Sequence, residues 1–239
     1  MEARPSQPIK GLIDGIAVIQ ELTYSDRPVS TTELSQKLML EKTHVNRILK
    51  TLAYIGLVFR TKQRKYIPGA GIHALAAQTL HASGLLQKAL PILEELQKYQ
   101  LIVALGVLWN QNVSYLYHWE PGISNYQALG RLASYPVTES SIGHVLLSQY
   151  EREEIEQKIN SFPNVQSEDN QKLITQIMLA KVRGYGEVRR ENLSIGVKIG
   201  NPAFSAIAFS GKIAEMDEAE LITILRIAAE KIEKAMVAK

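Results

Sequence analysis

The chain of 239 residues contains no cysteine, so disulfides, thiolate zinc sites and cysteine nucleophiles are excluded. It also has no apolar run near the roughly 18 residues that a membrane-spanning helix requires. Its first ten residues, MEARPSQPIK, carry charges but lack the apolar core of a signal peptide. We therefore expect a cytoplasmic protein with no membrane partner.

Familiar catalytic motifs are also missing, including HExxH, the Walker phosphate loop and GxSxG. Residues 69–74 do fit the GxGxxA dinucleotide pattern, but they follow a predicted basic hairpin, and no βαβ unit comes after them. His73 and His81 would lie about 12 Å apart along a helix, too far to share a metal ion. We predict no catalytic residue, no metal and no cofactor, and an enzyme is kept only as an alternative.

Positive charge is concentrated in the first third of the chain. Residues 1–68 hold 11 Lys and Arg against 6 Asp and Glu, whereas residues 69–239 hold 16 against 18. The resulting net charges, +5 and −2, indicate a polyanion partner for the first third. Five charges could also simply be solvated.

Apolar spacing predicts two helices before residue 41. The first ends at a polar break over residues 24–28, and its apolar positions are Ile9, Leu12, Ile13, Ile16 and Ile19. Ser30 and Glu33 have the spacing of a capping box, so a second helix begins there and runs to about Leu38. Residues 39–41 must then turn the chain before the next helix, which predicts a helix-turn-helix.

The next segment, EKTHVNRILKTLAYIGLV (residues 41–58), predicts a helix with one apolar and one polar face. The apolar face is formed by Val45, Ile48, Leu49, Leu52 and Ile55. The polar face is formed by Thr43, Asn46, Arg47, Lys50 and Tyr54. No acidic residue follows Glu41 in this segment. Hydroxyl, amide and guanidinium groups on one helix face can read base edges in the major groove of DNA.

A basic hairpin is predicted after this helix. Gly56 is suited to cap the helix, and two short β-prone runs within residues 57–68 flank a tip in which four of six residues are basic. A helix-turn-helix followed by such a hairpin is a winged helix, whose basic groups neutralise DNA phosphates. The candidate DNA-binding residues are Thr32, Lys42, Thr43, His44, Asn46, Arg47, Lys50, Lys62, Arg64 and Lys65. A solvated basic face, or a winged helix that binds protein, is the alternative.

The remaining two thirds predict strands mixed with helices, without the regularity of βαβ units, which is typical of an α+β domain. The predicted helices cover residues 71–83, 85–98, 171–183 and 218–237, and one more runs from residue 142 through residue 159. In the helix over residues 85–98, one side carries Leu86, Leu90, Leu93 and Leu96. The predicted strands cover residues 101–109, 113–119, 126–132, 197–199 and 203–210, and the first two form a hairpin.

Several short motifs follow one another in a characteristic order. In the first third they are Thr32-Glu33-Leu34 with Leu38, Lys42 to Leu49, Gly56-Leu57-Val58 and Tyr66 to Gly69. Later ones are Leu90 to Leu96, Gly130-Arg131, Ile142-Gly143-His144, Arg183-Gly184-Tyr185, Gly196-Val197 and Ser210-Gly211. In this order and spacing, over nearly the whole chain, the sequence resembles the IclR family of bacterial transcriptional regulators.

The resemblance implies a winged-helix DNA-binding domain over residues 1–69, a linker helix over residues 70–83 and a regulatory domain over residues 84–239. The regulatory domain would hold a GAF-like antiparallel sheet with helices and bind a small-molecule effector. A homodimer or a dimer of dimers, a homotetramer, would bind a palindromic operator in double-stranded DNA. We expect a repressor controlled by an organic acid. An enzyme or protein-interaction module with the winged helix as scaffold is the alternative.

The resemblance also implies where the effector binds: at Ser140, Ser141, Ile142, Gly143, Val197, Ile199 and Ser210, to which we add Arg189 as a hypothesis of our own. Exposed N–H groups and hydroxyls at residues 140–143 would hold an anion at a helix start, unless Ser140 or Ser141 only caps that helix. Arg189 or Arg190 would make the rim of the pocket cationic. Alternatively, these arginines are solvated or pair with Glu187 and Glu191.

The sequence departs from the family pattern at several positions. Met39 stands where the family usually has glycine, which costs up to ~1 kcal/mol if the backbone there is left-handed. Glu41 stands where proline is common, and its charge suits a helix N-terminus. Val188 and Arg189 stand near a frequent acidic pair, and the hairpin between the last two strands looks shortened.

Overall fold

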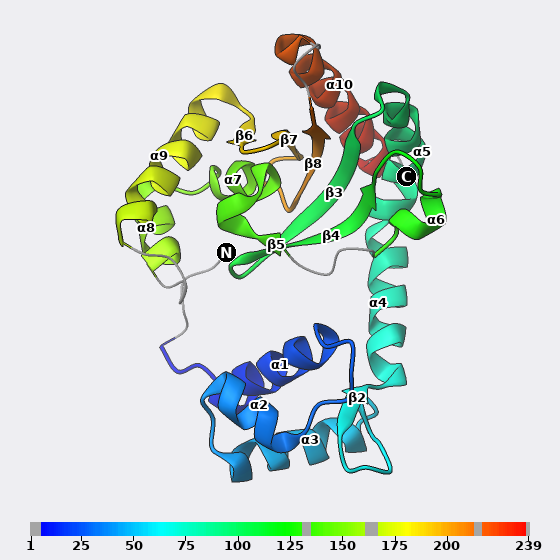
Figure 1. The fold of residues 1–239 in the computed structure, drawn as a ribbon, viewed down its shortest axis with the longest axis vertical. Helices are drawn as coiled ribbons and strands as arrows, with labels where there is room; N and C mark the ends of the chain where they lie inside the picture. Colours follow the sequence, from blue (N-terminus) through cyan, green and yellow to red (C-terminus); the bar gives the residue numbers. More distant parts are fainter. Residues whose placement is uncertain (1–5, 131–134, 161–166, 213–216, 238–239) are drawn as a thin grey trace. The chain divides into compact units, whose positions relative to one another are not determined.

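The computed structural model describes residues 6–130, 135–160, 167–212 and 217–237, and the chain divides into two compact units, residues 1–82 and 83–239 (Figure 1). Helices and an antiparallel sheet make up the second unit, and the first unit contains a helix-turn-helix, so the predicted α+β class is confirmed. In the described residues, no helix combines the length and apolar character needed to cross a membrane.

The first unit is a winged helix followed by one further helix. Its elements are α1 (Lys10–Thr23), α2 (Thr31–Leu38), α3 (Lys42–Tyr54), β1 (Val58–Arg60), β2 (Tyr66–Pro68) and α4 (Ala70–Ser83). Strands β1 and β2 pair antiparallel and form the predicted wing. The capping box at the start of α2 is present, with the Ser30 hydroxyl accepting from the Glu33 N–H and the Glu33 carboxylate accepting from the Ser30 N–H.

The core of the first unit confirms the apolar face of α3 and corrects that of α1. Val45, Leu49 and Leu52 are buried as predicted, whereas Ile55, at the end of the helix, is exposed. Helix α1 buries Val18 and Leu22 instead, and the predicted apolar positions Ile9, Leu12, Ile13 and Ile16 are exposed. Helix α1 has two apolar faces. The face that carries Val18 and Leu22, which are four residues apart, packs with α3 and β2.

The turn between α2 and α3 contains a left-handed residue, Met39, at the position where the family usually has glycine. This residue caps α2 with φ 53° and ψ 38°, and its side chain is 92% exposed. A side chain that gains no packing contact does not offset the cost of a left-handed conformation. The wing tip holds a second such residue, Arg64, with φ 62°.

In its described residues, the second unit contains six strands and several helices. Before the sheet's last strands, its elements are α5 (Leu85–Leu96), η1 (Gln97–Tyr99), β3 (Ile102–Trp109), β4 (Asn112–Trp119), α6 (Asn125–Ala128), β5 (Tyr135–Pro136), η2 (Val137–Glu139) and α7 (Ser141–Leu147). They are followed by α8 (Arg152–Asn160), α9 (Ser167–Arg183), β6 (Gly186–Arg189), β7 (Leu193–Ile199), β8 (Ser205–Gly211) and α10 (Glu218–Val237). The strands form one antiparallel sheet in the order β5-β4-β3-β8-β7-β6.

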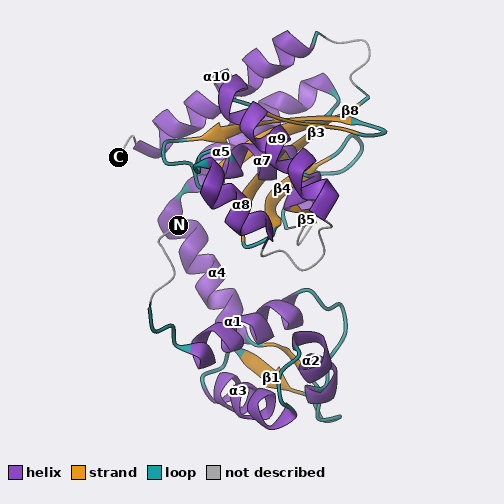
Figure 2. Cartoon of the chain, turned by 90° about the vertical axis from the view of Figure 1, so that its left-hand side faces the viewer, coloured by secondary structure: helices purple, strands orange, loops and turns teal. Residues whose placement is uncertain are grey.

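The two faces of this sheet are covered by different helices (Figure 2). Val103, Ile195 and Ile207 point to the face covered by α5 and α10, where the larger core lies. On the other face, α7 packs beside Ala206 and Ala208. Alternation of side chains along each strand assigns neighbouring residues to opposite faces, so the larger side chains pack toward α5 and α10 and the smaller ones toward α7.

Several expectations for this unit need correction. A strand was predicted over residues 126–132, but residues 125–128 form helix α6, because Ser124 and Gln127 make a capping box. Residues 131 and 132 of that predicted strand lie outside the described residues. The helix predicted over residues 142–159 is two helices, α7 and α8. Strand β6 was not predicted, because two of its four residues are charged. On α5 the buried residues include Leu85 and Ala89, whereas Leu86 and Leu90 are partly buried.

Candidate functional site

The exposed face of α3 carries most of the predicted DNA-binding side chains. Thr43, Arg47 and Lys50 are exposed and Asn46 is partly exposed, on the side opposite the buried Val45 and Leu49. Lys42 is exposed in the first turn of α3, and Thr32 is exposed on α2. The helical period therefore brings hydroxyl, amide and cationic groups to one surface, as the sequence predicted.

His44 differs from its neighbours on α3, because it contacts a carboxylate. Its Nε2 atom lies 2.8 Å from Oδ2 of Asp14, a residue of α1 that is 9% exposed. A buried carboxylate needs a hydrogen-bonding partner, and His44 supplies it. The structure thus places His44 between α1 and the exposed face of α3, where it fixes the helix that carries Arg47.

The wing presents the second group of basic residues. Lys62 and Arg64 are exposed at its tip and Lys65 is partly exposed. The tip is closed by hydrogen bonds from the Thr61 N–H to the Lys65 carbonyl, at 2.8 Å, and from the Arg64 N–H to the Thr61 carbonyl, at 3.0 Å. A closed tip holds the cationic side chains on a short, defined hairpin.

These cations are not neutralised by the described part of the chain. Within it, no carboxylate forms an ion pair with Lys42, Arg47, Lys50, Lys62, Arg64 or Lys65. The nearby pairs involve other cations, Arg27 with Glu33 and Lys37 with Glu21. Uncompensated positive charge on α3 and on the wing suits a polyanion such as DNA.

A cavity of about 480 Å³ lies on the α7 side of the sheet in the second unit. Its floor is made of small side chains, since Ala104 on β3 pairs directly with Ala208 on β8. Beside it, α7 approaches the sheet closely: a Cβ atom on Gly186 would lie 2.2 Å from the Ser141 carbonyl oxygen, and one on Gly196 would lie 2.9 Å from the Ser141 carbonyl carbon. The helix therefore packs closely over glycines, and the cavity lies beside it, where Ala104 and Ala208 belong to the lining.

A bulge on β4 brings two aromatic side chains to this cavity. Leu105 and Gly106, which are adjacent on β3, pair with Tyr117 and Tyr115, so Leu116 is the extra residue. The extra residue reverses the alternation: Tyr117 packs in the core under α5, whereas Tyr115 and His118 both line the cavity. Their rings meet edge to face, with centroids 5.3 Å apart.

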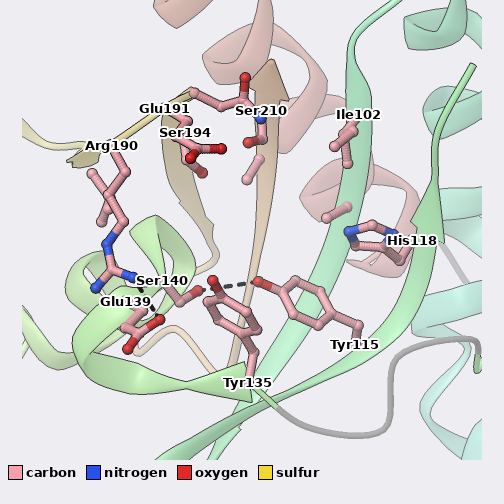
Figure 3. Close-up of a pocket in the computed structure, with 14 residues that line it drawn as sticks. Ile102, Tyr115, His118, Tyr135, Glu139, Ser140, Arg190, Glu191, Ser194 and Ser210 are labelled. Atoms are coloured by element: carbon pink, nitrogen blue, oxygen red, sulfur yellow. Dashed lines mark hydrogen bonds and ion pairs between the residues drawn. The ribbon is translucent and has the colours of Figure 1, made fainter. Parts of the chain in front are cut away.

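Hydroxyl groups from several parts of the chain line the cavity (Figure 3). The Tyr115 hydroxyl lies 3.3 Å from the Ser140 hydroxyl, and Ser194 and Ser210, directly paired on β7 and β8, also line the cavity. Burial raises the pKa of Tyr115, although the hydrogen bond to Ser140 acts in the opposite direction. The phenol therefore stays protonated at neutral pH and can donate a hydrogen bond to a ligand.

Ser140 itself has the capping role that was the alternative to anion binding. Its hydroxyl accepts a hydrogen bond from the Gly143 N–H, at 3.2 Å, at the start of α7. Ser141 is buried and its hydroxyl lies 2.8 Å from that of Ser194. Ile142 and Gly143 belong to the packed part of α7, and a Cβ atom on Gly143 would lie 2.6 Å from a Val137 methyl group.

The two predicted arginines have different surroundings. Arg190 lines the cavity, and its Nη1 atom lies 2.7 Å from Oε2 of Glu139, which also lines it (Figure 3). Arg189 does not line it: its guanidinium binds Glu187, at 2.5 Å, and Glu218, at 2.6 Å. Both residues therefore form ion pairs. The pair of Arg189 with Glu187 agrees with the alternative to a cationic rim, in which these arginines pair with neighbouring glutamates.

The remaining predicted effector residues divide between the two faces of the sheet. Ser210 lines the cavity together with Ser140. Val197 and Ile199 lie on the opposite face, in the core shared with α10. The alternation along β7 explains this, because Ser194 faces the cavity and residues at odd positions face away from it.

Several residues of the cavity were not predicted from the sequence. They are Ile102, Ala104, Tyr115, His118, Tyr135, Glu139, Val188, Glu191, Asn192, Ser194 and Ala208. Tyr115 and His118 depend on the bulge, which leaves no mark in the amino-acid pattern. Tyr135 and Glu139 lie in short elements, β5 and η2, that periodicity cannot detect. In the described residues, no group of three or more potential ligands could hold a metal ion.

Comparison with known sequences identifies the family. A family model described as bacterial transcriptional regulator IclR, C-terminal, matches residues 77–234. The HTH-type transcriptional regulator KdgR of Dickeya chrysanthemi is 24% identical, over 95% of this chain and 80% of its own length. KdgR of Escherichia coli K12 is 25% identical, over 95% of this chain and 93% of its own length.

Solved structures share the fold along almost the whole chain. An IclR homolog from Microbacterium hydrocarbonoxydans, crystallised with 4-hydroxybenzoate, is 21% identical. The match covers 96% of this chain and 100% of that one, with a TM-score of 0.69. At this identity the likeness concerns the fold, and the residues of this cavity have to be judged on their own chemistry.

Proposed function

Because the chain belongs to the IclR family of bacterial transcriptional regulators, DNA-binding proteins controlled by small-molecule effectors, we propose that it is a repressor whose effector is a small organic acid. In this proposal residues 1–69 bind the operator, residues 70–83 are the linker and residues 84–239 bind the effector. The observation that carries the proposal is the combination of an uncompensated cationic surface on α3 and the wing with a separate polar cavity of about 480 Å³.

In the proposed complex, α3 enters the major groove of the operator. Thr43, Asn46 and Arg47 offer groups that can distinguish base edges, and a guanidinium can bind guanine with two hydrogen bonds. Thr32, Lys42 and Lys50 flank them, and His44 positions the helix through Asp14. Lys62, Arg64 and Lys65 of the wing contact phosphates, which adds affinity without reading sequence.

One winged helix buries too little surface for tight and specific binding. We propose that two or four chains bind together, as a homodimer or a dimer of dimers, on a palindromic operator whose symmetry matches that of the protein. Such a regulator works where bacterial DNA lies, in the cytoplasm. The relatives are transcriptional regulators, and the proposal assigns no catalysis to this chain.

The lining of the cavity supports an acid with hydroxyl groups as the effector. Among the described side chains that line the cavity, Arg190 is the one arginine or lysine, and a carboxylate is its natural partner. Ser140, Ser194 and Ser210 add hydroxyl groups to the lining of the cavity. The rings of Tyr115, His118 and Tyr135 provide flat surfaces for the carbon skeleton.

The proposal is tested with the full-length protein and an operator selected from random-sequence duplex DNA. Fluorescence anisotropy should detect binding that weakens steeply as the salt concentration rises, because phosphate contacts release counter-ions. Addition of an acid that fits the cavity should weaken the complex further. Absence of DNA binding, or binding without salt dependence, would favour the enzyme or protein-interaction alternative.

A further inference from the structure

We propose that Glu139 determines the specificity of the cavity, because its carboxylate occupies the place on Arg190 that the carboxylate of the ligand takes. The inference rests on the proposed function, since it concerns an acid in the same cavity. The two residues come from different walls: Glu139 ends η2, before α7, and Arg190 follows β6. Their side chains meet at 2.7 Å (Figure 3).

Arg190 is the cation that a ligand can reach. Arg189, its neighbour, is held outside the cavity by Glu187 and Glu218. The Gly143 N–H at the start of α7 donates to the Ser140 hydroxyl, which also lies 3.3 Å from the Tyr115 hydroxyl. That N–H is already bonded within the protein, and Arg190 supplies the guanidinium among the described residues that line the cavity.

The ion pair is weak enough to be exchanged. The side chains of Arg190 and Glu139 are 57% and 34% exposed, so water screens their attraction. A carboxylate that approaches Arg190 from the cavity would also contact Ser194 or Ser210 on the floor, and a charge-assisted hydrogen bond is stronger where less water competes. Glu139 can then turn into solvent, because it lies at the edge of the cavity.

Acids can make this exchange, whereas neutral compounds of the same shape cannot. When one carboxylate replaces another, the guanidinium of Arg190 keeps a negative partner throughout. A neutral ligand cannot replace Glu139 without leaving Arg190 unpaired, so it has to bind beside the closed ion pair. Glu139 therefore lowers the affinity for ligands that need Arg190 and has little effect on those that bind beside the closed ion pair.

The matched control is Glu191, the second carboxylate of the lining. It lies next to Arg190 in the sequence and is exposed, and within the described residues it forms no ion pair. Glu139→Gln and Glu191→Gln remove the same charge from the same cavity, with side chains of nearly the same size. Only the first of them frees Arg190.

The test is isothermal titration calorimetry on the full-length protein with two acids and their neutral counterparts. The pairs are gluconate with sorbitol and 4-hydroxybenzoate with 4-hydroxybenzamide. Glu139→Gln should bind at least one acid about three to ten times more tightly than the unchanged protein, without a comparable gain for its neutral partner. Glu191→Gln should show no such selective gain. Arg190→Gln should bind the acid weakly, and adding Glu139→Gln to it should restore nothing.

The proposal is overturned if Glu139→Gln binds neither acid more tightly, if the neutral compounds gain equally, or if the gain persists without Arg190. Ala208→Leu, which places a larger side chain on the cavity floor, separates this failure from a failure of the proposed function. If Ala208→Leu abolishes ligand binding while Glu139→Gln has no selective effect, the cavity is the effector site and only the role of Glu139 is wrong. Thermal melting of each variant verifies that it is folded.

Discussion

The imidazole Nε2 of His44 lies 2.8 Å from Oδ2 of Asp14, and this contact joins the helix that presents Arg47 to α1. Asp14 is buried and His44 is its hydrogen-bonding partner. We predict that the two residues are energetically coupled. In a double-mutant cycle of Asp14→Asn and His44→Gln, measured by urea unfolding, the coupling should be about 1–2 kcal/mol. Additive effects of the two changes would contradict this role.

Arg47→Ala should weaken binding of the selected operator by about 1–3 kcal/mol and relax its sequence preference, because Arg47 is proposed to read a base. Lys62→Ala in the wing should weaken binding to all sequences alike and lower the salt slope by about 1. Lys231→Ala removes one positive charge from α10 and serves as the control. Anisotropy titrations at several salt concentrations measure all three, and an unchanged affinity for Arg47→Ala would rule out its role.

Met39→Gly should stabilise the protein by about 0.5–1 kcal/mol, because glycine adopts the left-handed backbone without the cost that a side chain brings. The side chain is 92% exposed, so little packing is lost. Met39→Ala is the control, since it shortens the side chain but keeps the Cβ atom. Urea unfolding should rank glycine above both methionine and alanine; a destabilised glycine variant would show that the side chain has another role.

Much of the winged helix could be predicted from the sequence, because its signals are local. The capping box of Ser30 and Glu33, the stripe of Val45 and Leu49, and the basic hairpin each depend on residues close together in the chain. The buried face of α1 could not be predicted in the same way. Both of its faces are apolar, and contacts with α3 and β2, distant in sequence, decide which one is buried.

The cavity was less predictable, because it depends on features that periodicity does not detect. Ser140 and Ser210, which were named through the family resemblance, line it, and their binding of the effector stays a prediction. The bulge opposite Gly106 sets the direction of Tyr115 and His118. Glu139 reaches Arg190 only because η2 and the end of β6, 51 residues apart, meet in the fold.

Acid should destabilise the second unit through His144. Burial lowers the pKa of its imidazole below the ordinary 6.5, and the charge of Arg190 acts in the same direction, against hydrogen bonds to the Thr138 and Glu187 backbone. The unfolded chain therefore binds a proton at a pH where the folded chain does not. The free energy of unfolding should fall as the pH drops below about 6.5, by at most about 1.4 kcal/mol per pH unit from this group, until the folded state also takes up the proton.

His144→Gln should remove this contribution and flatten the pH dependence between about pH 7 and pH 5, measured by urea unfolding at each pH. His73→Gln, at an exposed position of α4, serves as the matched control. An equally steep pH dependence in the His144 variant would show that other groups cause the acid sensitivity.

Operator affinity measured with and without a bound acid shows whether the cavity controls DNA binding. We predict that a saturating acid weakens the complex by a factor of about 5 to 150, the usual range of coupling between two sites. Ala208→Leu should remove this response. If operator affinity stays the same while calorimetry detects the acid bound to the protein, the cavity does not control DNA binding.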